Sequence, residues 1–302
     1  RHARGARMCY NRKKRMARRY KRYKMRCETL HLKEIYPFLG ADGRDAVLDC
    51  YLPYNMPEMH REGQKRRTLL ICPGGGYQFV SEREGEPVAA HFLAAGYNVF
   101  VLHYSVDVHR FPAQICEVAA ALDLIRARAD AWNCDAEKLS LLGFSAGAHL
   151  AAHYATAFDC AAVRAHFPES RNVNAVLLGY PVISAAAGLA HAGSFEHLCG
   201  HYPLTAAEEE QFSCDRLVRD DTPPTFLWHT AADKTVPVAN SLRYAEALAA
   251  HGVPFELHVY PFGWHGLSTA DDETAANPLP AKLKPVHAWL ADAVRFLGDV
   301  LG

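Results

Sequence analysis

Residues 139–155 read LSLLGFSAGAHLAAHYA, and this stretch decides the fold. An apolar run at residues 139–142 leads into G-x-S-x-G at residues 143–147, and a run with helical spacing follows. A serine between small residues, on a sharp turn from a strand into a helix, is typical of a nucleophile elbow, which lifts the hydroxyl above the edge of a parallel sheet. We therefore predict that Ser145 is a nucleophile.

Short apolar runs and helical patterns alternate along the rest of the chain. Strands are predicted at residues 46–52, 68–72, 98–104, 138–142, 173–180, 224–229 and 254–260. Helices are predicted at residues 87–95, 113–131, 146–157, 238–250 and 283–300. Several of the strands lack polar alternation, which is typical of strands covered on both faces. Because alternating strands and helices imply right-handed crossovers, we expect an α/β fold with a mostly parallel central sheet and helices on both faces.

Local signals refine two parts of this scheme. Gly96 is the expected C′ residue of the helix at residues 87–95, and Ser81 and Glu84 have the spacing of a capping box near its start. Residues 184–222 lack a clear strand and are predicted to form a small insertion. The sequence leaves open whether this insertion is a lid or irregular surface.

The charge is divided unevenly along the chain. Residues 1–27 contain thirteen basic residues and no acidic residue, and because the whole chain is neutral, residues 28–302 carry a net charge of −13. An acidic body suits neither the phosphates of nucleic acids nor anionic lipid. We interpret residues 1–27 as a solvated or spurious tail before one α/β domain at residues 28–302, and expect neither nucleic acid nor membrane as a partner. A nucleic-acid-binding arm is the alternative, since three tyrosines interleave the tail's charges.

The nine cysteines form no C-x-x-C motif, and their number is odd. We expect free thiols in a reducing compartment, with a structural disulfide as the alternative. No stretch reaches the roughly 18 apolar residues of a membrane span, and no apolar segment of a signal peptide follows the basic residues. A cytoplasmic location is predicted, although Met8, Met16 or Met25 could each be the true start.

Two candidate partners for Ser145 follow it in the chain. Asp233 comes just after the predicted strand at residues 224–229, and His265 comes just after the one at residues 254–260. The carboxyl ends of neighbouring parallel strands meet at one edge of a sheet. We predict that His265 is the general base and that Asp233 orients it, because a serine hydroxyl needs such a base. The alternatives are a helix-capping role for Asp233 and an ordinary loop position for His265.

A glycine run, PGGGY at residues 73–77, follows the predicted strand at residues 68–72. Glycines let backbone N–H groups approach a ligand closely, so Gly75 and Gly76 are predicted to form an oxyanion hole together with Ala146. A phosphate cradle is disfavoured, since G-x-x-x-x-G-K-[ST] is absent. No H-E-x-x-H or similar ligand spacing occurs, and neither a metal nor a cofactor is expected.

The sequence resembles the esterase branch of the α/β hydrolases that includes bacterial acetyl esterases and acetyl xylan esterases. The resemblance spans residues 45–297 and rests on CPGGGYQFVSEREGEPVA, AAGYNVFVLHYSV, FPAQICEVAAALDLIR, LSLLGFSAGAHLAAHYA, PPTFLWHTAADKTVPV and VYPFGWHG. It implies the same triad and oxyanion donors. In two places the chain departs from related patterns. Pro73 stands where hormone-sensitive-lipase relatives carry a histidine, and Ala148 replaces a glycine of the common SAGGHLA.

The resemblance also implies a reaction. We expect a serine esterase that removes short acyl groups, acetyl above all, from a sugar or oligosaccharide through an acyl-enzyme. A general carboxylesterase, a peptidase or a formamidase on the same scaffold is the alternative, as is a non-catalytic interaction protein that has kept the fold. Tyr77, Phe144 and Trp264 are candidate pocket residues, with packing in the core as their alternative role.

Overall fold

The computed structural model describes residues 25–302, which contain one eight-stranded sheet. The strands are β1 (Arg26–His31), β2 (Val47–Leu52), β3 (Arg66–Cys72), β4 (Asn98–His103), β5 (Cys134–Phe144), β6 (Ala175–Gly179), β7 (Thr225–Thr230) and β8 (Phe255–Tyr260). They lie in the order β1-β2-β4-β3-β5-β6-β7-β8. The pairs β1–β2 and β2–β4 are antiparallel and the other neighbours are parallel, so the predicted, mostly parallel sheet is confirmed.

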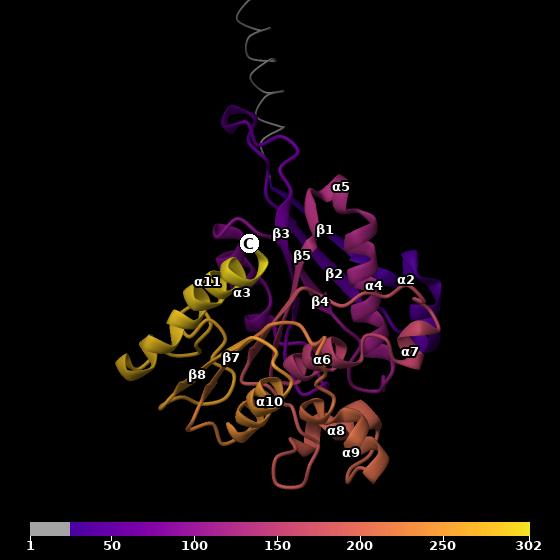
Figure 1. Ribbon diagram of the computed structural model, residues 1–302, viewed down its shortest axis with the longest axis vertical. Coiled ribbons are helices and arrows are strands. Elements are labelled where there is room, and N and C mark those ends of the chain that lie inside the picture. Colours follow the sequence, from indigo (N-terminus) through magenta and orange to yellow (C-terminus); the bar gives the residue numbers. More distant parts are fainter. Residues whose placement is uncertain (1–24) are drawn as a thin grey trace, which may run out of the picture.

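Helices cover both faces of the sheet (Figure 1). They are α2 (Leu32–Ile35), α3 (Glu86–Ala94), α4 (Ala113–Ala127), α5 (Ala129–Trp132), α6 (Ser145–Ala157), α7 (Ala161–Arg164), α8 (Ala192–Cys199), α9 (Ala206–Phe212), α10 (Ala239–Ala250) and α11 (Trp289–Leu301). Short 3₁₀ segments are η1 (Pro37–Gly43), η2 (Pro57–Met59), η3 (Glu82–Glu84), η4 (Cys214–Arg216) and η5 (Ala281–Ala288).

Two apolar cores follow from the two covered faces. In β3, Leu70 and Cys72 join the core that includes α4, α6 and α10, whereas Leu69 and Ile71 join the core that includes α3 and α11. Successive side chains of a strand point to opposite faces, so one uninterrupted apolar run supplies both cores. This explains why the central strands of the sequence lacked polar alternation.

Three predicted boundaries are wrong. The first strand begins at Arg26, inside the segment assigned to the basic tail; it is a half-exposed edge strand, RCETLH, without a strong apolar pattern. The helix expected at residues 113–131 divides at Arg128 into α4 and α5. The helix expected at residues 283–300 starts only at Trp289, because Pro285 lies in the preceding 3₁₀ turn and cannot donate a helical hydrogen bond. The rest of the predicted tail, residues 1–24, lies outside the described residues.

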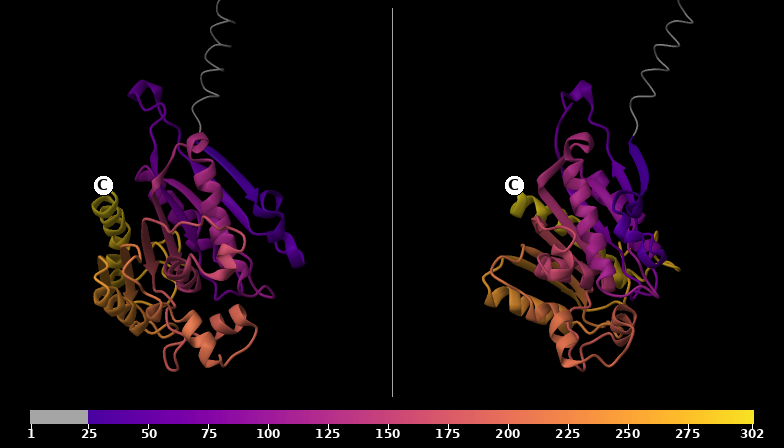
Figure 2. Two further views of the ribbon diagram at one scale, coloured as in Figure 1. Left: turned by 45° about the vertical axis from the view of Figure 1, so that its right-hand side comes forward. Right: turned by 90° about the vertical axis from the view of Figure 1, so that its right-hand side faces the viewer.

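The segment at residues 184–222 contains α8, α9 and η4 and no strand. It connects β6 to β7 and lies at the end of the molecule where β5 leads into α6 (Figures 1 and 2). Its helices are therefore near the carboxyl ends of the parallel strands, where α/β folds place their sites.

Two bulk expectations can be compared with the structure. Between residues 25 and 302, no helix is both long and apolar enough to cross a membrane. The cysteines of the same part of the chain, Cys27, Cys50, Cys72, Cys116, Cys134, Cys160, Cys199 and Cys214, are all free thiols, as predicted.

Candidate active site

Ser145 lies at the first position of α6, directly after β5. Its φ of +53° is left-handed, a strained conformation for a residue with a side chain, and it occurs on the sharp turn that the sequence predicted. The flanking glycines have no room for a side chain. A Cβ on Gly143 would overlap the Gly147 carbonyl, and one on Gly147 would overlap the carbonyl oxygens of Cys72 and Pro73. The elbow therefore packs directly against the end of β3.

The three predicted triad residues meet at the carboxyl edge of the sheet. Ser145 Oγ lies 2.7 Å from His265 Nε2, and His265 Nδ1 lies 2.7 Å from Asp233 Oδ2. These distances are those of hydrogen bonds, so His265 can accept the proton of Ser145 while its other nitrogen donates to the carboxylate. Ser145 is buried, with 7% of its surface exposed.

Asp233 has no exposed side-chain surface, and every oxygen has a partner. Oδ1 accepts the N–H groups of Thr235 and Val236 at 2.8 and 3.0 Å, and Oδ2 also lies 3.4 Å from His229 Nε2. Burial raises the pKa of the carboxyl, but the two imidazoles and the Val236 N–H outweigh it and hold the pKa well below its usual value. Asp233 therefore stays ionised at neutral pH. Its turn precedes α10, whose N-cap is Val238, so it does not cap that helix.

The predicted glycine loop adjoins the elbow, since a Cβ on Gly74 would lie 3.0 Å from Ser145 Cβ, and two of its N–H donors are unused. Within residues 25–302, no hydrogen bond of the loop uses the N–H of Gly75 or Gly76. The N–H of Ala146 belongs to the first turn of α6, where helical partners are lacking. Gly75 has φ +122°, and a Cβ there would overlap the Phe79 carbonyl, so glycine is required at this position. The arrangement fits three backbone donors for an oxyanion.

Glu84 holds the glycine loop in place, although the sequence predicted only a helix-capping role for this residue. The structure corrects the expected capping box: Ser81 makes no side-chain cap. The buried Glu84 carboxylate instead accepts the Gly74 N–H at 2.7 Å and the Tyr180 hydroxyl at 2.5 Å. The same hydroxyl accepts the Ser268 N–H at 3.1 Å, and the Tyr180 ring lies edge-on to His265, with centroids 5.0 Å apart. One carboxylate thus links the glycine loop to the segment that carries the base.

The insertion also contributes to the site. His191, the N-cap of α8, accepts the Ser194 N–H through its Nδ1, and Ser194 Oγ lies 3.9 Å from the place of a Cβ on Gly76. Burial lowers the pKa of His191, and the nearby charge of His265 lowers it further. No sequence signal distinguishes His191 among seventeen histidines, because only the fold brings α8 to the glycine loop.

The three candidate pocket residues have different surroundings. Tyr77 is buried, and its hydroxyl lies 2.8 Å from His149 Nδ1 in the core. Phe144 has no exposed surface and packs against Tyr180 and Trp289. Tyr77 and Phe144 thus have the packing role that the sequence left open for them: one loop and one strand-end residue point inward and fill the two cores. Trp264, next to His265, is 50% exposed.

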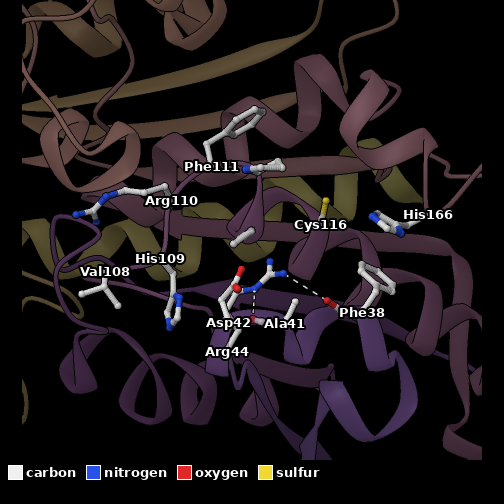
Figure 3. Close-up of a pocket in the computed structure, with 12 residues that line it drawn as sticks. Phe38, Ala41, Asp42, Arg44, Val108, His109, Arg110, Phe111, Cys116 and His166 are labelled. Atoms are coloured by element: carbon white, nitrogen blue, oxygen red, sulfur yellow. Dashed lines mark hydrogen bonds between the residues drawn. The ribbon is translucent and has the colours of Figure 1, made fainter.

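A cavity of about 640 Å³ lies apart from the triad (Figure 3). It is bounded by η1, by the loop before α4 and by His166, whose ring stacks on Phe38. The loop also touches the glycine run, because Asp107 donates its N–H to the Tyr77 carbonyl. None of the triad residues lines this cavity, so it is not the catalytic pocket.

Comparisons with known proteins show the family to which this fold belongs. The sequence profile of the BD-FAE family matches residues 48–248. The chain belongs to the BD-FAE family of α/β hydrolases. The solved structure of an acetyl ester-xyloside bifunctional hydrolase from Caldicellulosiruptor lactoaceticus superimposes with a TM-score of 0.76 and 32% identity, covering 92% of this chain and 97% of that one.

Two curated relatives of this BD-FAE protein are longer than it is. It is 38% identical over 233 residues to endo-1,4-beta-xylanase B of Butyrivibrio fibrisolvens, a match that covers 74% of this chain and 36% of the relative. It is 28% identical over 265 residues to an acetylxylan esterase of Xylanibacter ruminicola, covering 85% of this chain and 52% of the relative. The chain thus matches between about a third and a half of the length of these relatives.

Replacing Asp233 tests its assignment. Asp233→Asn keeps the shape of the side chain and an Oδ1 that can accept the N–H groups of Thr235 and Val236. The amide, however, favours the wrong tautomer of the His265 imidazole. We expect kcat on a nitrophenyl ester to fall by up to about 10⁴-fold. Asp221→Asn is the matched control, because Asp221 pairs with Arg219 on the surface before β7. An active Asp233→Asn beside an inactive Asp221→Asn would reverse the assignment.

Replacing Glu84 tests the link between the two loops. Glu84→Gln presents an amide N–H₂ to a site lined by donors, which loosens the glycine loop. We expect kcat to fall by about 10²-fold, the cost of misplacing a catalytic group by about 1 Å, while KM changes little. Tyr180→Phe should show the same division between kcat and KM. The exposed neighbour Glu82 provides the control Glu82→Gln; equal effects of the two glutamine variants would contradict the positioning role.

Proposed function

We propose that this BD-FAE protein is a serine esterase that hydrolyses short acyl esters, acetyl esters in particular, carried by a sugar or oligosaccharide. The single observation that carries the proposal is the chain of two 2.7 Å contacts from Ser145 through His265 to Asp233, beside the unused N–H groups of the glycine loop. Acyl transfer needs this combination of nucleophile, base and oxyanion donors.

The reaction proceeds in two steps. His265 accepts the Ser145 proton as Oγ attacks the ester carbonyl, and the N–H groups of Gly75, Gly76 and Ala146 bind the oxyanion. His265 then donates the proton to the leaving alcohol, which leaves an acyl-enzyme. Water, deprotonated by the same imidazole, releases the acid. Asp233 remains ionised throughout and stabilises the imidazolium.

The surroundings of the glycine loop favour a short acyl group. Ser194 Oγ of α8 lies 3.9 Å from the place of a Cβ on Gly76, so the insertion borders the space next to the oxyanion donors with a polar group. A long acyl chain needs an apolar groove, in which each buried methylene contributes about 0.8 kcal/mol. The polar N-terminus of α8, with His191 and Ser194, does not offer such a surface.

Exposed aromatic rings support a sugar as the alcohol. Phe79 is 57% exposed and its carbonyl packs against Gly75, while the half-exposed Trp264 adjoins His265. The two rings belong to the two loops that meet at Ser145. The names of the relatives, acetylxylan esterase and acetyl ester-xyloside hydrolase, are consistent with this substrate class.

The free thiols of residues 25–302 also support our prediction of a reducing, cytoplasmic compartment.

Covalent labelling of the nucleophile distinguishes an active serine esterase from a non-catalytic protein that has kept the fold. A fluorophosphonate probe should modify the full chain once, at Ser145, and Ser145→Ala should abolish labelling and lower kcat by about 10⁴-fold or more. Ser140→Ala is the control, because Ser140 lies on β5 within the core. If folded Ser145→Ala kept a tenth of the esterase activity, Ser145 would not be the nucleophile.

A chain-length series tests the substrate. Values of kcat/KM for nitrophenyl acetate, butyrate and octanoate should fall with length, and acetylated xylo-oligosaccharides should release acetate. The physical reason is the polar border that His191 and Ser194 give to the space beside Gly76. A steady rise toward octanoate would favour a general carboxylesterase, and cleavage of anilides or formamides in preference to esters would favour the peptidase or formamidase alternative.

A further inference from the structure

Three side chains of types that can bind a metal meet away from the triad. His91 lies on α3, Asp271 lies in the segment after β8, and His287 lies on η5. One ligand atom of each lies within 4.8 Å of the other two. His91 Nε2 and His287 Nδ1 are each 3.7 Å from Asp271 Oδ2, so the carboxylate oxygen is shared between the two imidazoles.

We propose that His91, Asp271 and His287 bind one divalent ion of the zinc class. Two imidazoles and a carboxylate are a donor set that zinc prefers, with a water molecule completing the coordination. A tetrahedral ion with bonds of about 2.0–2.1 Å holds its ligand atoms about 3.4 Å apart. The 3.7 Å separation of His91 Nε2 from Asp271 Oδ2 is close to this value. His287 Nδ1 lies at the same distance but is bonded to the Thr269 carbonyl, so the His287 ring either exchanges that bond for the ion or turns to present Nε2.

The carboxylate is oriented before any ion binds. Asp271 Oδ1 accepts the Thr269 hydroxyl at 2.7 Å and the N–H groups of Glu273 and Thr274 at 3.1 and 3.3 Å. These contacts fix the group and leave Oδ2 directed toward the two imidazoles. Burial raises the pKa of Asp271, but the hydrogen bonds of Thr269 and Thr274 outweigh it and lower the pKa overall, so the ligand is ionised at neutral pH.

The two imidazoles are also held in place. His287 Nδ1 lies 2.7 Å from the Thr269 carbonyl, and the rings of His91 and His287 meet edge to face with centroids 5.3 Å apart. A hydrogen bond from one ring nitrogen to a carbonyl is the usual way in which proteins orient a metal-binding histidine. Coordination through His287 Nε2 preserves that bond, whereas coordination through Nδ1 replaces it.

The surroundings leave access for the ion and a water molecule. The three side chains are between 30% and 42% exposed, and a cavity of about 260 Å³ adjoins Asp271 and His287. Asp272 and Lys284 also line the cavity. The acid partly offsets the charge of the ion. Lys284 opposes a cation, but it is exposed and its long side chain can extend into solvent.

An ion at this position would link three separate segments: α3, the segment after β8, and η5. It would fix the segment after His265 to α3 and η5, next to Ser268, whose hydroxyl donates to the Arg83 carbonyl. None of the three ligands belongs to the triad or to the glycine loop. We therefore assign the ion a structural role that raises stability and supplies no chemistry. Sequence spacing predicted no metal because the ligands are separated by 180 and 16 residues.

Calorimetric titration of the chelator-treated full chain with Zn²⁺ at pH 7.5 tests this site. We expect one saturable equivalent, and a melting temperature raised by about 5 °C at a free Zn²⁺ concentration of a hundred times Kd. Asp271→Asn, which keeps the Oδ1 contacts, and the double variant His91→Ala with His287→Ala should each weaken binding at least tenfold. The same variants should lose the visible spectrum that a bound Co²⁺ gives the native chain.

His103→Ala is the matched control, because His103 and Asp49 form a similarly exposed pair with a single imidazole. This control should bind one equivalent like the native chain. The proposal fails if the native chain shows no saturable equivalent, if Asp271→Asn and the double variant bind as tightly as the native chain, or if His103→Ala loses the same equivalent. Esterase activity is measured in parallel on each metal-free protein and should be unchanged by the ligand variants, so this outcome is independent of the proposed function.

Discussion

The close packing of the nucleophile turn against the end of β3 is the constraint on which the site depends. Gly147 allows the first turn of α6 to touch the carbonyl oxygens of Cys72 and Pro73, and Gly143 allows the turn to close on itself. Because β3 and β5 are parallel neighbours, the glycine loop that follows β3 is delivered to the side of Ser145. A methyl group at either glycine would separate the nucleophile from its oxyanion donors. The strain of the left-handed Ser145 is balanced by this packing.

Two buried carboxylates with different partners organise the remaining groups. Asp233 faces imidazoles and N–H groups, and it determines which His265 nitrogen carries the proton. Glu84 faces an N–H and a phenol, and it connects the loop after β3 with Tyr180 after β6. Burying a carboxylate is costly unless it accepts hydrogen bonds, so each acid is effective only when its neighbours are in place. Each acid therefore aligns catalytic groups only when the strands that carry its hydrogen-bond partners have folded correctly.

The insertion between β6 and β7 gives the common hydrolase frame its particular character. The insertion brings the polar start of α8 to the glycine loop. His149 connects the insertion to this loop, because its two ring nitrogens form hydrogen bonds with the Tyr77 hydroxyl and the Phe212 carbonyl. The residue expected to line the pocket, Tyr77, is therefore a tie between the site and the insertion. Variation in this segment can change the space beside Ser145 without disturbing the triad, since the triad rests on β5, β7 and β8.

The sequence by itself determined the mostly parallel α/β fold, seven of the eight strands, the elbow and the candidate triad. These features depend on local pattern: apolar runs of strand length, a serine between two glycines, and polar residues directly after a strand. Only the tertiary structure decided the roles of Glu84, Tyr180 and His191, the inward direction of Tyr77 and Phe144, and the meeting of His91 with Asp271 and His287. Each of these depends on contacts between segments distant in the chain, and periodicity carries no information about which distant residues meet. The edge strand β1 escaped prediction for a related reason: its pairing with β2, rather than an apolar pattern of its own, makes it a strand.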